Sequence, residues 1–254
     1  MRSLVSRLLN RSSLGLWPVR VRKGLLAGAR WTIYPWTSYW RGGYEPHLQA
    51  AILSLGGGNI QGWNCWDLGA HFGFYSVSLA RRVGPSGQVA AFEPNPQSFA
   101  RLARHKRMNH LEWLKLYPSA VSDRSGSADL LTYGDLNATT THLAYEGETL
   151  SGQTGALSVP IVRLDDLVDR RELRPPQLVK IDVEGHGHKA LRGMAHTLES
   201  FRPTIIVGFH SSQEVAGVLE LLDPLGYERT EIQPYSGSGD KEIGRDFLFR
   251  APSK

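Results

Sequence analysis

The chain has 254 residues, with 29 lysine and arginine residues against 24 aspartate and glutamate residues, which gives a formal charge of +5. A composition of 41% hydrophobic and 21% charged residues is that of an ordinary globular protein. The single cysteine, Cys65, excludes an intramolecular disulfide and a cysteine-based zinc site. No apolar run approaches the roughly 18 residues that a membrane-spanning helix needs.

The positive charge is concentrated at one end of the chain. Eight basic residues precede Glu45, which is the first acidic residue, so residues 45–254 hold 21 basic residues against 24 acidic ones. A nucleic-acid enzyme would spread its basic residues around the site that follows the phosphates. The composition therefore argues against a nucleic-acid partner and predicts two parts, a basic, tryptophan-rich N-terminal arm at 1–44 and a folded domain at 45–254.

The arm allows several interpretations. The favoured one is a segment that packs on the domain, and the others are peripheral contact with a membrane surface and a mitochondrial transit peptide. A cleavable secretory signal fits poorly, because no uninterrupted apolar segment precedes a small-residue cleavage site. The expected location is the cytoplasm, with membrane association if the arm binds lipid, or the mitochondrion if the arm is a transit peptide.

From residue 63 onward, short apolar runs alternate with helical patterns. The predicted strands are 64–68, 88–92, 114–117, 159–163, 178–181 and 204–209, followed by a terminal pair at 227–232 and 246–250. The predicted helices are 74–83, 97–108, 164–170, 188–198 and 212–222. This alternation predicts an α/β fold with a parallel sheet and crossover helices. The polar residues 133–157 are predicted to form a long loop with a functional role.

A glycine-rich turn joins the first predicted strand to the first helix, in the segment CWDLGAHFGFYS. Asp67 lies near the carboxyl end of the strand, and the turn itself contains Gly69, Ala70, His71 and Gly73. Gly69 allows a tight turn and the approach of a ligand to bare backbone, while the start of the helix offers free N–H groups. Such a turn fits a dinucleotide or a nucleoside, and it also occurs for purely structural reasons.

The next strand ends in the segment QVAAFEPNP, which places Glu93 at its tip. A carboxylate there can accept hydrogen bonds from both hydroxyls of a ribose. The segment from Gly69 to Gly73 lacks the third glycine of a pyrophosphate cradle, which disfavours a nicotinamide-dependent oxidoreductase. S-adenosylmethionine has no phosphate and needs acids near its ribose and its ammonium group, and Asp67 and Glu93 can supply them.

Five segments, WDLGAHFGFYS, AFEPNP, AVSDRSG, VRLDDL and VKIDVEGHGHKALRGM, resemble the FkbM-type methyltransferase family in their order and approximate spacing. The resemblance covers most of the chain. It implies a class I methyltransferase (Rossmann-like) fold with a seven-stranded, mostly parallel sheet, helices on both faces, an antiparallel last strand and S-adenosylmethionine as the cofactor. It also implies roles for Asp67, Gly69 and Gly73 on the methionine side, Glu93 at the ribose, Ser122 with Asp123 at the adenine, and Asp182 with Glu184 facing the methyl group.

The chain departs from the family pattern at two places. The usual Glu-Gly-x-Glu block has Gly187 in place of its second acid, between His186 and His188. Many relatives end the fifth strand with an acid, where this chain has Gly208-Phe209-His210. Any role of the missing carboxylate is therefore open, and Glu184 or a histidine is the candidate to replace it.

The carboxyl ends of the predicted parallel strands carry Asp67, Glu93, Asp182 and His210, so these side chains are expected to meet in one crevice. Methylation of a hydroxyl requires removal of its proton, and His210 is the first candidate base, followed by Glu184 and Asp182. His186 and His188 could join Asp182 at a metal, but no third clear ligand follows, so no metal site is predicted.

The sequence thus predicts an S-adenosylmethionine-dependent O-methyltransferase that acts on a hydroxyl of a sugar, glycolipid or secondary metabolite. The arm and residues 133–157 are expected to wall the acceptor side. The alternative is a non-catalytic cofactor-binding or assembly module that docks on a membrane or a partner through the arm. The fold alone does not specify the acceptor.

Overall fold

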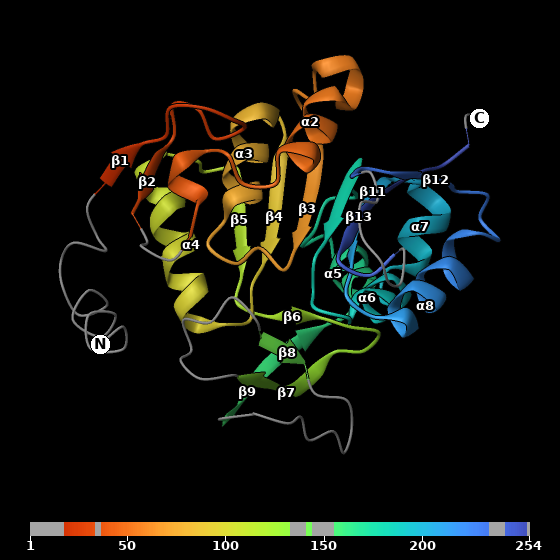
Figure 1. Ribbon diagram of the computed structural model, residues 1–254. Helices are drawn as coiled ribbons and strands as arrows, with labels where there is room; N and C mark the ends of the chain where they lie inside the picture. The colour runs from red at the N-terminus through yellow and green to blue at the C-terminus, as the bar shows by residue number, and fades with distance from the viewer. Residues whose placement is uncertain (1–17, 34–36, 133–140, 144–154, 234–241, 253–254) are drawn as a thin grey trace.

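The computed structural model describes residues 18–33, 37–132, 141–143, 155–233 and 242–252. Its main sheet has seven strands in the order β12-β13-β11-β10-β3-β4-β5 (Figure 1). They are β3 (Asn64–Leu68), β4 (Gln88–Phe92), β5 (Leu114–Tyr117), β10 (Leu178–Ile181), β11 (Thr204–Phe209), β12 (Glu228–Glu231) and β13 (Arg245–Arg250). Neighbouring strands pair in parallel except for β13, which is antiparallel to β11 and β12. The predicted mostly parallel sheet with an antiparallel last strand is confirmed.

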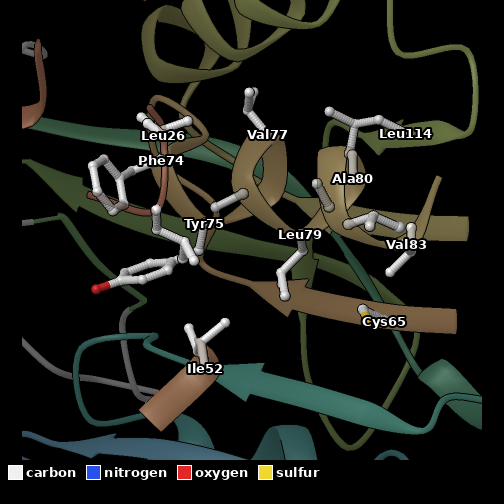
Figure 2. Packing of buried hydrophobic residues seen from close by; sticks show 14 of the residues in the cluster. Leu26, Ile52, Cys65, Phe74, Tyr75, Val77, Leu79, Ala80, Val83 and Leu114 are labelled. Carbon is white, nitrogen blue, oxygen red and sulfur yellow. The ribbon is translucent and has the colours of Figure 1, made fainter. Parts of the chain in front are cut away.

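Helices cover both faces of this sheet, which is why its central strands are continuous apolar runs. One face carries α2 (Pro46–Ser54), α3 (Phe74–Val83) and α4 (Pro96–Met108), and the other carries α5 (Leu164–Asp169), α6 (Gly187–Arg192), α7 (Ala195–Phe201) and α8 (Ser212–Leu222). Figure 2 shows Cys65 of β3 packed on the first face with Leu79 and Val83 of α3. Burial raises the pKa of the Cys65 thiol, as expected for an unreactive packing residue.

The order of the strands reverses between β3 and β10. The chain runs outward from β3 through β4 to β5, and then returns to build β10 and β11 on the other side of β3. The Asp182 N–H donates to the Leu68 carbonyl at 3.0 Å, so β3 and β10 remain hydrogen-bonded to each other as far as their carboxyl ends. In open α/β sheets, ligands bind outside the carboxyl ends at such a reversal point.

A second sheet lies beyond the carboxyl ends of the main sheet (Figure 1). It has the order β6-β9-β7-β8, from β6 (Ala120–Val121), β7 (Gly126–Thr132), β8 (Thr141–Leu143) and β9 (Gly155–Val162). The strand predicted at 159–163 is part of β9 and pairs here rather than in the main sheet. The prediction of a loop at 133–157 was wrong at residues 141–143, which form β8, and at 155–157, which begin β9. Residues 133–140 and 144–154 lie outside the described residues.

The helix predicted at 188–198 is interrupted, because tertiary contacts override its helical pattern. Gly193, between α6 and α7, packs so closely on the neighbouring chain that a Cβ there would lie 2.0 Å from the Ser122 carbonyl oxygen. The buried Asp165 carboxylate then caps α7, accepting the N–H groups of His196 at 3.0 Å and Thr197 at 3.1 Å. The residues at the break therefore contact two other segments of the fold. Gly193 packs on Ser122, and the start of α7 is bonded to Asp165.

The described part of the N-terminal arm packs on the domain. Strands β1 (Pro18–Arg20) and β2 (Arg30–Thr32) form a hairpin, and Trp31 is buried in the same core as α3. Trp31 stacks on His105 of α4 at 3.6 Å, and His105 Nε2 accepts the Thr32 N–H at 3.2 Å. Tyr44 packs against the same core, and Glu45 Oε2 accepts the Tyr75 hydroxyl at 2.6 Å. The division at residues 44 and 45 stays a prediction. No helix within the described ranges is both long enough and apolar enough to span a bilayer.

Candidate active site

A pocket of about 260 Å³ lies at the carboxyl ends of the main sheet, between that sheet and the second one. Its wall combines residues from the N-terminal segment, the strand ends of the main sheet and the second sheet. The lining residues are Tyr39, Tyr44, Glu45, Gly69, His71, Phe92, Glu93, Pro94, Ser98, Ser119, Ala120, Val121, Leu130, Leu143, Asp182, Val183, Glu184 and His210. The predicted crevice therefore brings together Glu93, Asp182 and His210.

Gly69 allows the loops after β3 and β10 to touch at the floor of this pocket. Its φ is +82°, and a Cβ on this residue would lie 1.9 Å from the Asp182 carbonyl oxygen. A side chain there would push the two loops apart, and the left-handed backbone would be strained for any residue except glycine. The floor is therefore bare backbone, which suits the close approach of a ligand.

Glu93 is buried at the end of β4, and both of its carboxylate oxygens accept backbone hydrogen bonds. Oε2 accepts the His71 N–H at 2.7 Å, and Oε1 accepts the Asn95 N–H at 2.8 Å. Burial raises the pKa of Glu93 to about 7, although these two donors oppose the shift. Each carboxylate oxygen retains a second lone pair, so Glu93 can still accept hydroxyl groups from the pocket.

His71 lines the pocket beside Glu93. Its Nδ1 lies 3.1 Å from the Tyr39 hydroxyl, and its Nε2 is buried without a hydrogen-bond partner among the described residues. Burial lowers the pKa of His71 to about 4, so the ring is neutral at neutral pH. A buried polar atom of this kind calls for a partner, and a ligand in the pocket can provide it.

Asp67 does not line the pocket, because it belongs to a buried ion pair behind the wall. Its Oδ2 accepts the Ser76 hydroxyl at 2.5 Å, and its Oδ1 lies 3.6 Å from Lys180 Nζ. Lys180 is 3% exposed and also contacts Asp182 Oδ2 at 3.3 Å. The sequence placed Asp67 in the crevice because it lies near the carboxyl end of a strand, but its charge is paired with Lys180 of β10, which is buried behind the wall.

Asp182, Glu184 and His210 form a cluster in the lining of the pocket. His210 Nε2 lies 3.4 Å from Asp182 Oδ1 and 3.7 Å from Glu184 Oε2. Burial alone would raise the pKa of Asp182, but Lys180 and His210 hold it below its ordinary value. Burial alone would lower the pKa of His210, whereas Glu214, Asp182 and Glu184 raise it to about 9. His210 is therefore mostly protonated at neutral pH, and only its minor neutral form can accept a proton.

Glu214 is a residue of the site that the sequence reasoning missed. It is fully buried in α8, and its carboxylate accepts the Gly187 N–H and the His210 N–H, each at 2.8 Å. The segment from Ser211 to Glu214 has the S-x-x-E pattern of a helix capping box, and the Ser211 hydroxyl does accept the Glu214 N–H at 3.1 Å. The carboxylate, however, joins two loops of the pocket wall instead of closing the box on Ser211.

The two departures from the family pattern both have a carboxylate beside them. A Cβ on Gly187 would lie 2.6 Å from Glu214 Oε1, and a Cβ on Gly208 would lie 3.1 Å from Asp246 Oδ1. Burial is the main cause that raises the pKa of Asp246, to about 7. Acids from α8 and β13 therefore occupy the space next to the two glycines.

Four other predicted cofactor residues lie outside the lining. Ala70 packs in the core, and its N–H donates to the Phe92 carbonyl at 2.9 Å. Gly73 packs against the Leu102 side chain. The Ser122 hydroxyl contacts Asp123 Oδ1 and His186 Nε2, both at 3.1 Å, while the preceding residues 119–121 line the pocket instead. Within the described residues, no three His, Cys, Asp or Glu side chains are grouped to hold a metal ion.

The N-terminal segment contributes a wall that the sequence indicated only in general terms. Tyr39 and Tyr44 line the pocket with their rings in an edge-to-face contact at 4.6 Å. Glu45 Oε2 accepts the Tyr75 hydroxyl at 2.6 Å, which fixes this segment on α3. Leu143 of β8 is the lining residue from the predicted loop at 133–157. The arm and this insertion thus both reach the pocket, as expected.

The strand order, the antiparallel β13 and the pocket at the reversal point define a class I methyltransferase fold. A precorrin-6y C5,15-methyltransferase from Geobacter metallireducens shares this fold, with a TM-score of 0.50 and 13% identity over 83% of this chain and 90% of that one. Residues 67–229 match the methyltransferase FkbM domain family, and the chain belongs to this family of S-adenosylmethionine-dependent methyltransferases.

Two curated relatives are similar in sequence. The hexuronic acid methyltransferase AglP of Haloferax volcanii is 29% identical over 187 residues, which cover 71% of this chain and 69% of AglP. The 2-O-methyltransferase NoeI of Sinorhizobium fredii is 29% identical over 165 residues, which cover 59% of this chain and 63% of NoeI. Both are named as methyltransferases, and they differ in the acceptor that their names describe.

The carboxylate of Glu214 should set the charge state of His210. Replacing Glu214 with Gln removes a negative charge that raises the pKa of His210, so this pKa should fall from about 9 toward the ordinary 6.5. NMR titration of the His210 ring in the full chain measures the change, with circular dichroism to confirm folding. Glu220→Gln on the exposed side of the same helix is the control, and an unchanged His210 pKa in Glu214→Gln would contradict the assignment.

Proposed function

We propose that this protein is an S-adenosylmethionine-dependent O-methyltransferase whose acceptor is a hydroxyl of a sugar. The observation that carries the proposal is one pocket whose lining holds two chemically different groups of residues. The Gly69 backbone and the buried Glu93 carboxylate form the first group, and Asp182, Glu184 and His210 form the second. Two relatives, a hexuronic acid methyltransferase and a 2-O-methyltransferase, support by their names a sugar and an oxygen acceptor.

The first group of residues, around Gly69 and Glu93, fits the cofactor. Glu93 would hold the ribose hydroxyls, the Gly69 backbone would lie against the ligand, and the unpartnered His71 Nε2 would gain a hydrogen bond. When bound, S-adenosylmethionine supplies a methyl group on a sulfonium sulfur, which is an excellent leaving group. The protein therefore needs mainly to orient the acceptor. Such orientation can lower the activation free energy by roughly 7 to 11 kcal/mol.

The second group, Asp182, Glu184 and His210, would accept the proton of the acceptor hydroxyl and stabilise the resulting charge. As the new C–O bond forms, the hydroxyl proton would pass to the neutral form of His210 Nε2. Asp182 Oδ1 and Glu184 Oε2, at 3.4 and 3.7 Å, would stabilise the imidazolium that results. Glu214 would hold the His210 backbone and its ring in place. These groups supply general base catalysis, which is typically worth about 100-fold to 10,000-fold in rate.

Calorimetry with S-adenosylmethionine and S-adenosylhomocysteine tests the cofactor assignment. We expect both to bind, and Glu93→Ala to weaken binding by roughly 10-fold to 100-fold, because hydrogen bonds to a charged group contribute about 1.5–3 kcal/mol. Glu112→Ala is the control, since Glu112 is exposed.

Failure of both ligands to bind, or unchanged binding in Glu93→Ala, would contradict the proposal. Tighter binding of a nicotinamide dinucleotide would favour an oxidoreductase. Binding without methyl transfer to any polar acceptor pool would favour the non-catalytic module.

We also propose that a basic face of the protein contacts an anionic membrane surface. Arg20, Arg30 and Arg104 line a groove of about 340 Å³ together with Pro18, Val19 and Met108. The described segments that contribute these residues, 18–33 and 96–111, contain no acidic residue. Arginines around apolar side chains suit an anionic lipid headgroup with its adjoining hydrocarbon.

Vesicle sedimentation of the full chain tests this surface. We expect binding to vesicles that contain phosphatidylglycerol and little binding to pure phosphatidylcholine, and a loss of binding in the triple variant Arg20→Ser, Arg30→Ser, Arg104→Ser. The exposed residues Arg124, Arg174 and Arg250, changed to Ser together, give a control with the same net charge. Equal binding by the two triple variants would contradict a specific surface.

A further inference from the structure

The charge of the pocket restricts what the acceptor can be, and this inference rests on the proposed function. Among the lining residues that the structure describes, Glu45, Glu93, Asp182 and Glu184 are acids, and His210 is the residue with a raised pKa that makes it a cation. The acceptor end is the part of the lining around Glu45, Asp182, Glu184 and His210, and it holds three carboxylates and one imidazolium.

The cations near this end are already engaged by acids of the protein. Lys180 Nζ lies between Asp67 and Asp182, at 3.6 and 3.3 Å. The His210 ring has Asp182, Glu184 and Glu214 oxygens at 3.4 to 3.7 Å. An incoming carboxylate would thus meet cations whose charge is shared among several acids. S-adenosylmethionine carries a sulfonium, an ammonium and a carboxylate, so its single net positive charge does not reverse the excess of acids.

The remaining groups at the acceptor end suit an uncharged sugar. Tyr39 and Tyr44 line the same pocket, and the C–H faces of a pyranose pack on aromatic rings of this kind. Ionised carboxylates only accept hydrogen bonds, and sugar hydroxyls can donate to them. Glu45 Oε2 is held by the Tyr75 hydroxyl, so the position of this carboxylate is fixed before an acceptor arrives.

We propose that the acceptor is a neutral sugar and that the pocket discriminates against sugars that carry a carboxylate. Like charges brought together at a recognition site disfavour the wrong partner. The acids of the pocket would therefore select against an acidic sugar, in addition to stabilising the His210 cation. This acceptor class separates the chain from AglP, whose name specifies a hexuronic acid, although the two share the same family.

Matched acceptor pairs test this proposal with the purified full chain and S-adenosylmethionine labelled in its methyl group. Each pair is a methyl hexopyranoside and the corresponding methyl hexopyranosiduronate, in the gluco, galacto and manno configurations. We expect label in a neutral member, with kcat/KM about tenfold or more above that of its uronate, which corresponds to roughly 1.4 kcal/mol of discrimination. Glu45→Gln should narrow this ratio, whereas Glu112→Gln, at an exposed position, should leave it unchanged.

Equal or faster transfer to the uronate would overturn the proposal, and so would transfer to neither member of any pair. Calorimetry on the same preparation separates this failure from failure of the proposed function. Intact S-adenosylmethionine binding without transfer to neutral sugars refutes only the acceptor class, whereas absent cofactor binding refutes the methyltransferase assignment itself. An unchanged ratio in Glu45→Gln would show that this acid does not discriminate and would also count against the proposal.

Discussion

The buried ammonium group of Lys180 organises the carboxyl edge of the central sheet. It lies between Asp67 of β3 and Asp182 after β10, so it bridges the two strands at which the strand order reverses. Removal of one partner from a buried ion pair typically costs about 3–5 kcal/mol, because a charge is then left without compensation. Asp182 is held ionised by this contact, and its negative charge in turn helps to keep the proton on His210.

The main sheet could be predicted because its central strands are short, continuous apolar runs separated by helical patterns. The second sheet was harder to recognise. Strand β7 is mostly exposed over residues 126–129 and has no continuous apolar run, and it is stabilised by pairing with β9, which begins more than twenty residues later in the chain. The break between α6 and α7 was also hidden, since it depends on the contact between Gly193 and the backbone of Ser122.

The pocket could be predicted to the extent that its residues follow the carboxyl ends of parallel strands. This rule placed Glu93, Asp182 and His210 correctly, and it misplaced Asp67 because burial beside Lys180 is a tertiary property. No local signal indicates that Glu214 joins two loops, since its capping-box pattern predicts a helix start. The contribution of Tyr39 and Tyr44 likewise depends on how the N-terminal segment packs.

In the proposed enzyme, Glu93 holds the ribose of the cofactor, and the Asp182–His210 cluster faces the methyl group and the acceptor. A crystal structure of the full chain with S-adenosylhomocysteine tests this arrangement directly. We expect ribose hydroxyls on the Glu93 carboxylate, backbone contact at Gly69 and the thioether sulfur facing Asp182 and His210. A ligand bound elsewhere, or one in this pocket with Glu93 bonded only to His71 and Asn95, would contradict this assignment.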